Sequence, residues 1–177
     1  MKKILTKFDG LYLLKNKKHK DKRGYLLELY NKRNFQFNSV LNYISNSKKN
    51  TLRGLHFQKK YQQKKIVTIL KGEILDVCVD LRKKSKTFGK SFCINLNDKN
   101  GIFLSIPKGF AHGFCVISKS AIMHYMCSEK RYKKYEKSLR WDDKDLKIKW
   151  PKKKFILSNR DKLGITFKEF KLKLKSL

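Results

Sequence analysis

The chain has 177 residues, which suits a single folded domain, and its hydrophobic content of 40% argues against a disordered basic tail. The formal net charge is +31, yet only seven of the 45 basic residues are arginine. Recognition of phosphates and bases favours arginine, because its guanidinium donates two parallel hydrogen bonds. The lysines are instead scattered in twos and threes along the chain. We therefore interpret the charge as a lysine-rich surface and expect neither a nucleic acid nor a membrane as partner.

The cysteines and the start of the chain bear on the compartment. Cys78, Cys93, Cys115 and Cys127 lie within apolar runs and never in C-x-x-C spacing. Each is interpreted as a reduced thiol that packs as a small hydrophobe. The first residues lack the apolar core of a signal peptide, and no apolar stretch of about 18 residues follows. These features predict a cytoplasmic protein.

Short apolar or alternating segments follow one another along the chain and predict strands. Lys71-Gly72 marks a turn between two of them. No long segment has the 3.6-residue period of an amphipathic helix, so helix is expected only as a turn or two near Asn34 and near the C-terminus. The pattern predicts an all-β fold, a sandwich or a barrel. The predicted strands cover residues 24–30, 65–70, 73–80, 91–96, 101–106, 113–117 and 121–127.

Two histidines lie in glycine-bearing motifs, Leu52-Arg53-Gly54-Leu55-His56-Phe57-Gln58 and Ile106-Pro107-Lys108-Gly109-Phe110-Ala111-His112-Gly113-Phe114. Either histidine taken singly is most simply a buried, hydrogen-bonded imidazole. A metal site is the competing functional interpretation, because β-barrels often hold a metal with a His-x-His pair. Here the corresponding element offers one imidazole and the neutral amide of Gln58, which make a poor divalent site. The sequence therefore predicts no metal and no cofactor.

From Asp21 to Asp161, these and further segments resemble the dTDP-4-dehydrorhamnose 3,5-epimerases, a group of the cupins. The resemblance implies a cupin or jelly-roll antiparallel β-barrel with a few short helices. It implies one domain over residues 1–177, with a core over about 21–161 and a tail over 162–177. It also implies a homodimer whose subunits exchange an N-terminal strand. The matching segments are 21–25 with Glu28, 52–58, 72–82, Ser85 with 87–89, 106–114, Tyr125, 140–143, Leu146, 148–151 and 157–161.

The resemblance also implies an activity. The chain would be an isomerase that inverts C3, C5 or both in a nucleotide-diphosphate-linked 4-keto sugar, for cell-surface polysaccharide biosynthesis. A C–H bond beside a ketone is acidic because the carbanion delocalises as an enolate, so inversion needs a base on one face and an acid on the other. By family position His56 is the base, Asp161 orients it, Tyr125 is the acid and Lys65 lies near the C4 oxygen. On a strand over 121–127, Tyr125 points to the opposite face from His124.

Further positions match substrate contacts of the family. Arg23, Arg53 and His112 match positions that hold the diphosphate, where charged donors suit phosphate oxygens. Tyr25 and Glu28 match positions on the base side. The complete set of implied substrate-binding residues is Arg23, Tyr25, Glu28, Arg53, Gln58, Asp76, His112 and Arg131.

The chain departs from the family in two places. Many members carry Gln-x-Asn where thymine binds, and here the same register reads Leu41-Asn42-Tyr43. The lost amides predict a nucleotide other than thymidine, such as GDP, and a GDP-linked 4-keto-heptose is one substrate of that kind. The second departure is Arg131, which replaces a tyrosine that shapes the sugar pocket. It leaves the sugar and the number of inverted carbons open.

Two alternatives remain at this point. A related cupin 3,4-ketoisomerase would move the ketone from C4 to C3 by the same enolate chemistry. A non-catalytic basic protein would bind nucleic acid, but it would be expected to show clustered arginines and exposed aromatic residues, and the sequence shows neither pattern.

Overall fold

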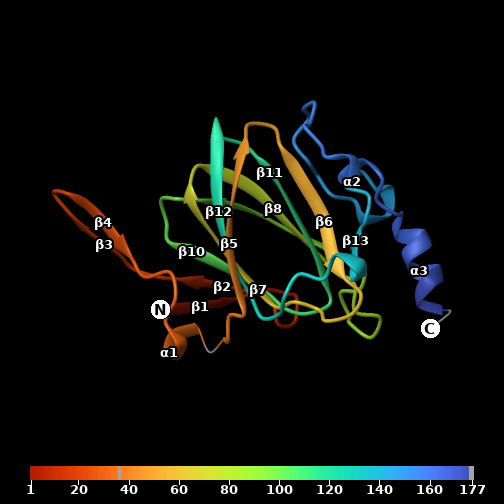
Figure 1. Cartoon of the computed structure of the whole chain (residues 1–177), viewed down its shortest axis with the longest axis horizontal. Coiled ribbons are helices and arrows are strands. Elements are labelled where there is room, and N and C mark those ends of the chain that lie inside the picture. The colour runs from red at the N-terminus through yellow and green to blue at the C-terminus, as the bar shows by residue number, and fades with distance from the viewer. Residues whose placement is uncertain (36, 176–177) are drawn as a thin grey trace.

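The computed structural model describes residues 1–35 and 37–175, and its strands form two large sheets and a separate hairpin (Figure 1). The ladders within these sheets are antiparallel. The six-stranded sheet has the order β1 (Lys2–Leu5), β2 (Tyr12–Lys15), β10 (Ile102–Ile106), β7 (Lys65–Lys71), β12 (Ser120–Cys127) and β5 (Leu41–Lys48). The five-stranded sheet has the order β13 (Glu136–Ser138), β6 (Leu52–Gln58), β11 (Phe110–Val116), β8 (Glu73–Asp80) and β9 (Ser91–Asn97).

The main core lies between the inner faces of the two large sheets. Alternate residues of a strand share a face, so each inner face contributes every second side chain. Val67 of β7 and Met123 of β12 pack in one buried cluster with Ile74 of β8 and Phe114 of β11. Burial of apolar surface on both inner faces holds the sheets together.

Helix content is small. The helices are α1 (Lys32–Phe35), α2 (Asn159–Lys162) and α3 (Phe167–Lys175), with 3-10 turns η1 (Lys133–Tyr135) and η2 (Lys144–Leu146). Helix α3 covers the outer face of the five-stranded sheet, where the ring of Phe170 lies 5.5 Å from that of Phe57 on β6. In the described part of the chain, no helix has the length and apolar character needed to cross a membrane.

The predicted all-β character is confirmed, and so are helices near Asn34 and in the C-terminal tail, of which residues 176–177 lie outside the described part. The predicted barrel is not closed. Among the described residues, no ladder joins an edge of one large sheet to an edge of the other. Side-chain packing, rather than a continuous ring of hydrogen bonds, therefore holds the two sheets together.

The four cysteines are free thiols, and three of them are buried as expected. Cys93 is the exception, because it lies on the edge strand β9 and is exposed.

One hairpin stands apart from both large sheets. Strands β3 (Lys18–Asp21) and β4 (Gly24–Leu27) pair only with each other among the described residues. Figure 1 shows this hairpin extending away from the body of the molecule. Its residues Arg23 and Tyr25 are exposed.

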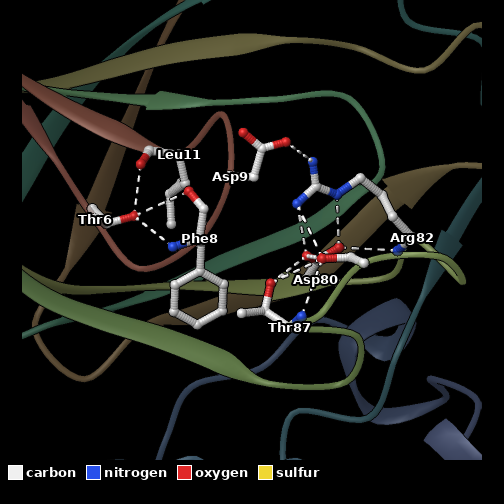
Figure 2. Close-up of polar contacts among 8 residues, drawn as sticks. Thr6, Phe8, Asp9, Leu11, Asp80, Arg82 and Thr87 are labelled. Atoms are coloured by element: carbon white, nitrogen blue, oxygen red, sulfur yellow. Dashed lines mark hydrogen bonds and ion pairs between the residues drawn. The ribbon is translucent and has the colours of Figure 1, made fainter.

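The loop between β8 and β9 is fastened by a buried carboxylate at the end of β8 (Figure 2). Asp80 accepts hydrogen bonds from Arg82 Nε at 2.9 Å, from Ser85 Oγ at 2.6 Å and from Thr87 Oγ1 at 2.7 Å. The guanidinium of Arg82 also lies 4.8 Å from the ring centroid of Phe110, at the start of β11. The motif over residues 80–89 therefore has a structural role that links β8, the loop and β11.

Candidate active site

A histidine–aspartate pair forms one side of the candidate site. The Nε2 atom of His56, on β6, lies 2.6 Å from Oδ1 of Asp161, on α2. Asp161 is 3% exposed and accepts two more hydrogen bonds, from Ser158 Oγ at 2.6 Å and from the Gly54 N–H at 3.2 Å. These donors fix the carboxylate, and the carboxylate in turn orients the imidazole.

The surroundings of this pair shift both pKa values. Burial lowers the pKa of His56, and the hydrogen bond to Asp161 opposes that effect only in part. Burial alone would raise the pKa of Asp161, but the hydrogen bonds from His56, Ser158 and Gly54 outweigh it and lower that pKa. The pair is thus a neutral imidazole beside a carboxylate at neutral pH. This arrangement suits a general base whose protonated form is stabilised by its partner.

Gly54 allows the two strands of the site to approach closely. A Cβ atom on Gly54 would lie 2.5 Å from Cα of Gly113 on β11, and the φ of Gly54 is +126°. The two strands place His56 and His112 opposite each other in register. A larger residue at Gly54 would therefore prevent this pairing of β6 with β11.

A second histidine–aspartate pair lies on the inner face of the five-stranded sheet. Nε2 of His112 and Oδ2 of Asp76 are 2.8 Å apart, and both residues are buried. The Sγ atom of Cys78 lies 3.7 Å from Oδ1 of Asp76. The ligand-type atoms of these three residues lie within 4.8 Å of one another. The sequence did not indicate this grouping, because the pairing of β8 with β11 brings it together.

The buried phenol of Tyr125, on β12, faces the same interior. Its hydroxyl lies 3.5 Å from Ser45 Oγ, and its ring stacks on that of Tyr43 with centroids 4.5 Å apart. Burial raises the pKa of Tyr125, so the phenol keeps its proton at neutral pH and is available as an acid. The expected orientation of Tyr125, into the interior with Met123 and Cys127, is confirmed.

Lys65 begins β7 beside these groups. Burial lowers the pKa of its ammonium, while the nearby Cys127 and Glu136 oppose the shift. It pairs in register with Cys127 on the neighbouring strand β12. A positive group at this point is suited to stabilising negative charge that develops on an oxygen.

These groups open onto one cavity of about 540 Å³, within the usual size range of small-molecule sites. Six of the implied site residues line it: His56, Tyr125, Lys65, Arg53, His112 and Arg131. Asp161 and Asp76 do not line the cavity and act on it through the histidines that they bind.

Four implied substrate-binding residues lie elsewhere. Arg23, Tyr25 and Glu28 belong to the β3–β4 hairpin or directly follow it, and they do not line the cavity of their own chain. Gln58 is buried, and its side-chain amide binds the backbone of two loops. The amide donates a hydrogen bond to the carbonyl oxygen of Tyr61 at 2.7 Å and accepts one from the N–H of Tyr132 at 2.8 Å. Gln58 therefore does not line the cavity but fixes the backbone of loops near it.

The cavity-lining residues that the sequence analysis left unassigned include an oppositely charged pair, Glu136 and Arg160. Glu136 binds Arg131 at 2.8 Å and Arg160 at 2.8 Å. Within the described residues, one buried terminal nitrogen of Arg160 has no hydrogen-bond partner. Arg160 lies within a segment that resembles the family and Glu136 lies shortly before another, but only the folded chain places them together.

The fold and the site together define a class, a two-sheet β protein whose interior cavity is lined by an aspartate-bound histidine and a buried phenol. A family model described as dTDP-4-dehydrorhamnose 3,5-epimerase matches residues 5–169, and the chain belongs to this family of isomerases. It is therefore an enzyme, and the alternative of a non-catalytic basic protein is not retained.

Relatives agree over almost the whole chain. The dTDP-4-dehydrorhamnose 3,5-epimerase of Methanothermobacter thermautotrophicus is 40% identical, over 90% of each chain. The enzyme of that name from Escherichia coli is 36% identical, over 98% of this chain and 99% of the relative.

Solved structures agree as well. The crystal structure of the Elizabethkingia anophelis epimerase has a TM-score of 0.88 at 39% identity, covering 96% of this chain and 97% of the other. The Legionella pneumophila epimerase, solved in complex with dTDP-4-keto-L-rhamnose, has a TM-score of 0.90 at 35% identity, covering 93% and 92%.

Proposed function

We propose that this enzyme inverts one or both carbons beside the C4 ketone of a nucleotide-diphosphate-linked 4-keto sugar. The observation that carries the proposal is that His56, supported by Asp161, and the buried phenol of Tyr125 line one cavity. The names of the relatives and the sugar nucleotide bound in the Legionella structure support this substrate class.

The proposed reaction passes through an enolate. His56 removes the proton from the carbon beside the ketone, and Asp161 stabilises the imidazolium that forms. The electron pair of the C–H bond moves onto the C4 oxygen, beside the ammonium of Lys65. Tyr125 then donates its proton to the opposite face of the carbon, which inverts it. His56 returns its proton to water and Tyr125 regains one, so the enzyme ends in its starting state and needs no cofactor.

Arg53 and His112 are the proposed diphosphate contacts within the cavity. Arg53 is held through Nε by Ser47 Oγ at 3.0 Å, and His112 is held by Asp76. A guanidinium beside a second donor suits phosphate oxygens. Arg131, held by Glu136, is proposed to contact the substrate farther along the same wall.

The proposal includes a homodimer in which the β3–β4 hairpin reaches the cavity of the partner subunit. The hairpin extends from the body and carries Arg23 and Tyr25, with Glu28 just beyond it (Figure 1).

Light scattering tests the dimer, and a monomeric mass would contradict it. Mixing Arg23→Ala with His56→Ala after reversible unfolding tests the exchange. If the hairpin crosses, mixed dimers contain one intact site and regain activity, whereas hairpins that stay on their own subunit leave both sites defective.

The nucleotide is proposed to be other than thymidine, either GDP or another nucleotide, and a GDP-linked 4-keto-heptose would be one such substrate. The register that carries thymine-binding amides in the family holds Leu41 and Tyr43 here, and both line the cavity. An unmet hydrogen-bonding edge of a buried base costs about 1–3 kcal/mol. Calorimetric titration with dTDP and GDP tests the point, and clearly tighter binding of dTDP would contradict it.

The reaction itself is tested by incubation with dTDP- and GDP-linked 4-keto sugars in deuterated water, followed by NMR. Deuterium at C3 or C5 with inversion is expected, and a role in cell-surface polysaccharide synthesis would follow from the product. A product with its ketone at C3 would mean a ketoisomerase instead. We expect the activity to survive treatment with a chelator, and elemental analysis to find no stoichiometric metal. Loss of activity on chelation would overturn the expectation that the enzyme is metal-free.

A further inference from the structure

Tyr43 lies where its side chain meets Tyr125 directly. It belongs to β5, an edge strand of the six-stranded sheet, and is the cross-strand partner of Tyr125 on β12. Directly opposed residues of antiparallel strands have side chains close enough to pack face to face. The two rings are stacked, with an interplanar angle of 14° and centroids 4.5 Å apart.

The ring of Tyr125 packs in the buried cluster between the sheets, and two further contacts bear on its orientation. Its hydroxyl makes one long contact, 3.5 Å, with Ser45 Oγ. The ring of His112 meets it edge-on, with centroids 6.3 Å apart and an interplanar angle of 70°, and Asp76 fixes His112 at 2.8 Å. The ring therefore lies between a fixed imidazole edge and the broad face of Tyr43. Hydrogen bonding alone does not define where the hydroxyl points.

Tyr43 itself is well anchored for such a role. It lies within the ladder of β5 and β12, which runs from Leu41 paired with Cys127 to Lys48 paired with Ser120. Tyr43 is nevertheless 40% exposed, so it contributes little to the core of the fold. A substitution there changes the cavity wall more than the stability of the chain.

We propose that Tyr43 is a positioning residue for Tyr125: its ring holds the phenol of Tyr125 in line with the reacting carbon. The inference rests on the proposed function, in which Tyr125 is the acid. In this inference Tyr43 acts on the reacting sugar through Tyr125. Its presence is then more than the absence of the amide that contacts thymine in other members of the family. Misplacing a reacting group by about 1 Å can reduce a rate by roughly 10²-fold.

The test compares Tyr43→Leu, which keeps apolar bulk but lacks a flat face, with Tyr43→Phe, which keeps the ring. For each variant, two rates are measured on one 4-keto sugar nucleotide in deuterated water: exchange of the substrate hydrogen and inversion. In Tyr43→Leu, inversion should fall by about 10- to 100-fold, while exchange through His56 stays within a few-fold of wild type and KM changes little. Tyr43→Phe should retain both rates. Ile44→Ala, the exposed neighbour on β5, is the matched control and should also retain both.

Each outcome is decisive. An unchanged ratio of exchange to inversion in Tyr43→Leu overturns the proposal, as does a Tyr43→Phe variant that fails like Tyr43→Leu. Equal losses of both rates would mean a merely structural role. If Tyr43→Leu does not fold by circular dichroism, Tyr43→Asn takes its place and should show the same raised ratio. Wild-type enzyme that neither exchanges nor inverts any tested substrate would instead defeat the proposed function, and this inference with it.

Discussion

The carboxylates of Asp80 and Asp161 are both buried and both saturated with hydrogen bonds, but they face different surroundings. The donors to Asp80 come from Arg82, Ser85 and Thr87, which belong to the loop that it fastens (Figure 2). One donor to Asp161 is instead the imidazole of His56, whose side chain is 31% exposed and lines the cavity.

This difference separates a structural cluster from the one that we propose to be catalytic. A carboxylate whose donors keep their protons over the physiological range stabilises a loop and does nothing else. A carboxylate paired with an imidazole, which can take up and release a proton, at the wall of a cavity, supports proton transfer. Four substitutions sharpen or break this comparison.

His56→Ala should have the largest effect. Without the base no enolate forms, so both inversion and exchange of the substrate hydrogen with solvent should fall by about 10²- to 10⁴-fold. The thermal midpoint should change little, because the imidazole is partly exposed and no large apolar group is lost. Proton NMR in deuterated water measures both rates. Exchange at the wild-type rate would mean that another group is the base.

Asp161→Asn should have an intermediate effect, because it removes the charge that supports protonated His56. It should also shift the pH profile. Burial already lowers the pKa of His56, and Asp161 partly opposes this, so the variant should lower that pKa further. A base acts when deprotonated, so activity is lost as pH falls through this pKa. The acid limb of kcat/KM should therefore move to lower pH in the variant, and a shift to higher pH would contradict the pairing.

Tyr125→Phe should separate the two rates. The ring and its packing remain, so His56 should still remove and return a proton on one face, giving deuterium exchange without inversion. The inversion rate should fall by about 10²-fold or more. Inversion near the wild-type rate would make Tyr125 a cavity wall, and the acid would then be sought at Tyr132 or a bound water.

Asp80→Asn should affect stability and leave the activity of the folded enzyme intact. The substitution removes the negative charge to which Arg82, Ser85 and Thr87 donate hydrogen bonds. This loss should lower the free energy of unfolding by about 2–3 kcal/mol. For a chain of this size the thermal midpoint should fall by roughly 4–12 °C. Asp9→Asn is the control: Asp9 is 97% exposed and 3.7 Å from Arg82, so its loss should leave the midpoint unchanged.

The pH dependence of stability gives a second measurement on Asp80. The hydrogen bonds from Arg82, Ser85 and Thr87 hold the pKa of Asp80 below its ordinary value, although burial alone would raise it. The resulting stabilisation is present at neutral pH and is lost as pH falls through the folded-state pKa. Melting curves of Asp80→Asn should therefore depend less on pH in the acidic range. An identical dependence would mean that Asp80 makes no ionic contribution.

Much of the local structure was predictable from the sequence. Strands over 65–71, 73–80 and 120–127 follow from alternating or continuous apolar residues, because successive side chains of a strand point to opposite faces. The same alternation correctly predicted that Tyr125 and His124 point to opposite faces of β12, and Tyr125 lies in the core. Strand β5 (Leu41–Lys48) was missed because it is an edge strand with polar residues on most of its length, and such a pattern has no apolar period to detect.

What only the tertiary structure decided is which side chains meet. From the sequence, the change at Tyr43 indicated a lost base contact, whereas the pairing of β5 with β12 stacks its ring on Tyr125. The grouping of Asp76, Cys78 and His112 likewise depends on the β8–β11 register. Period is a local property of the backbone, but register between strands distant in sequence is chosen by how the whole core packs, and a shift of one residue would turn each of these side chains to the other face.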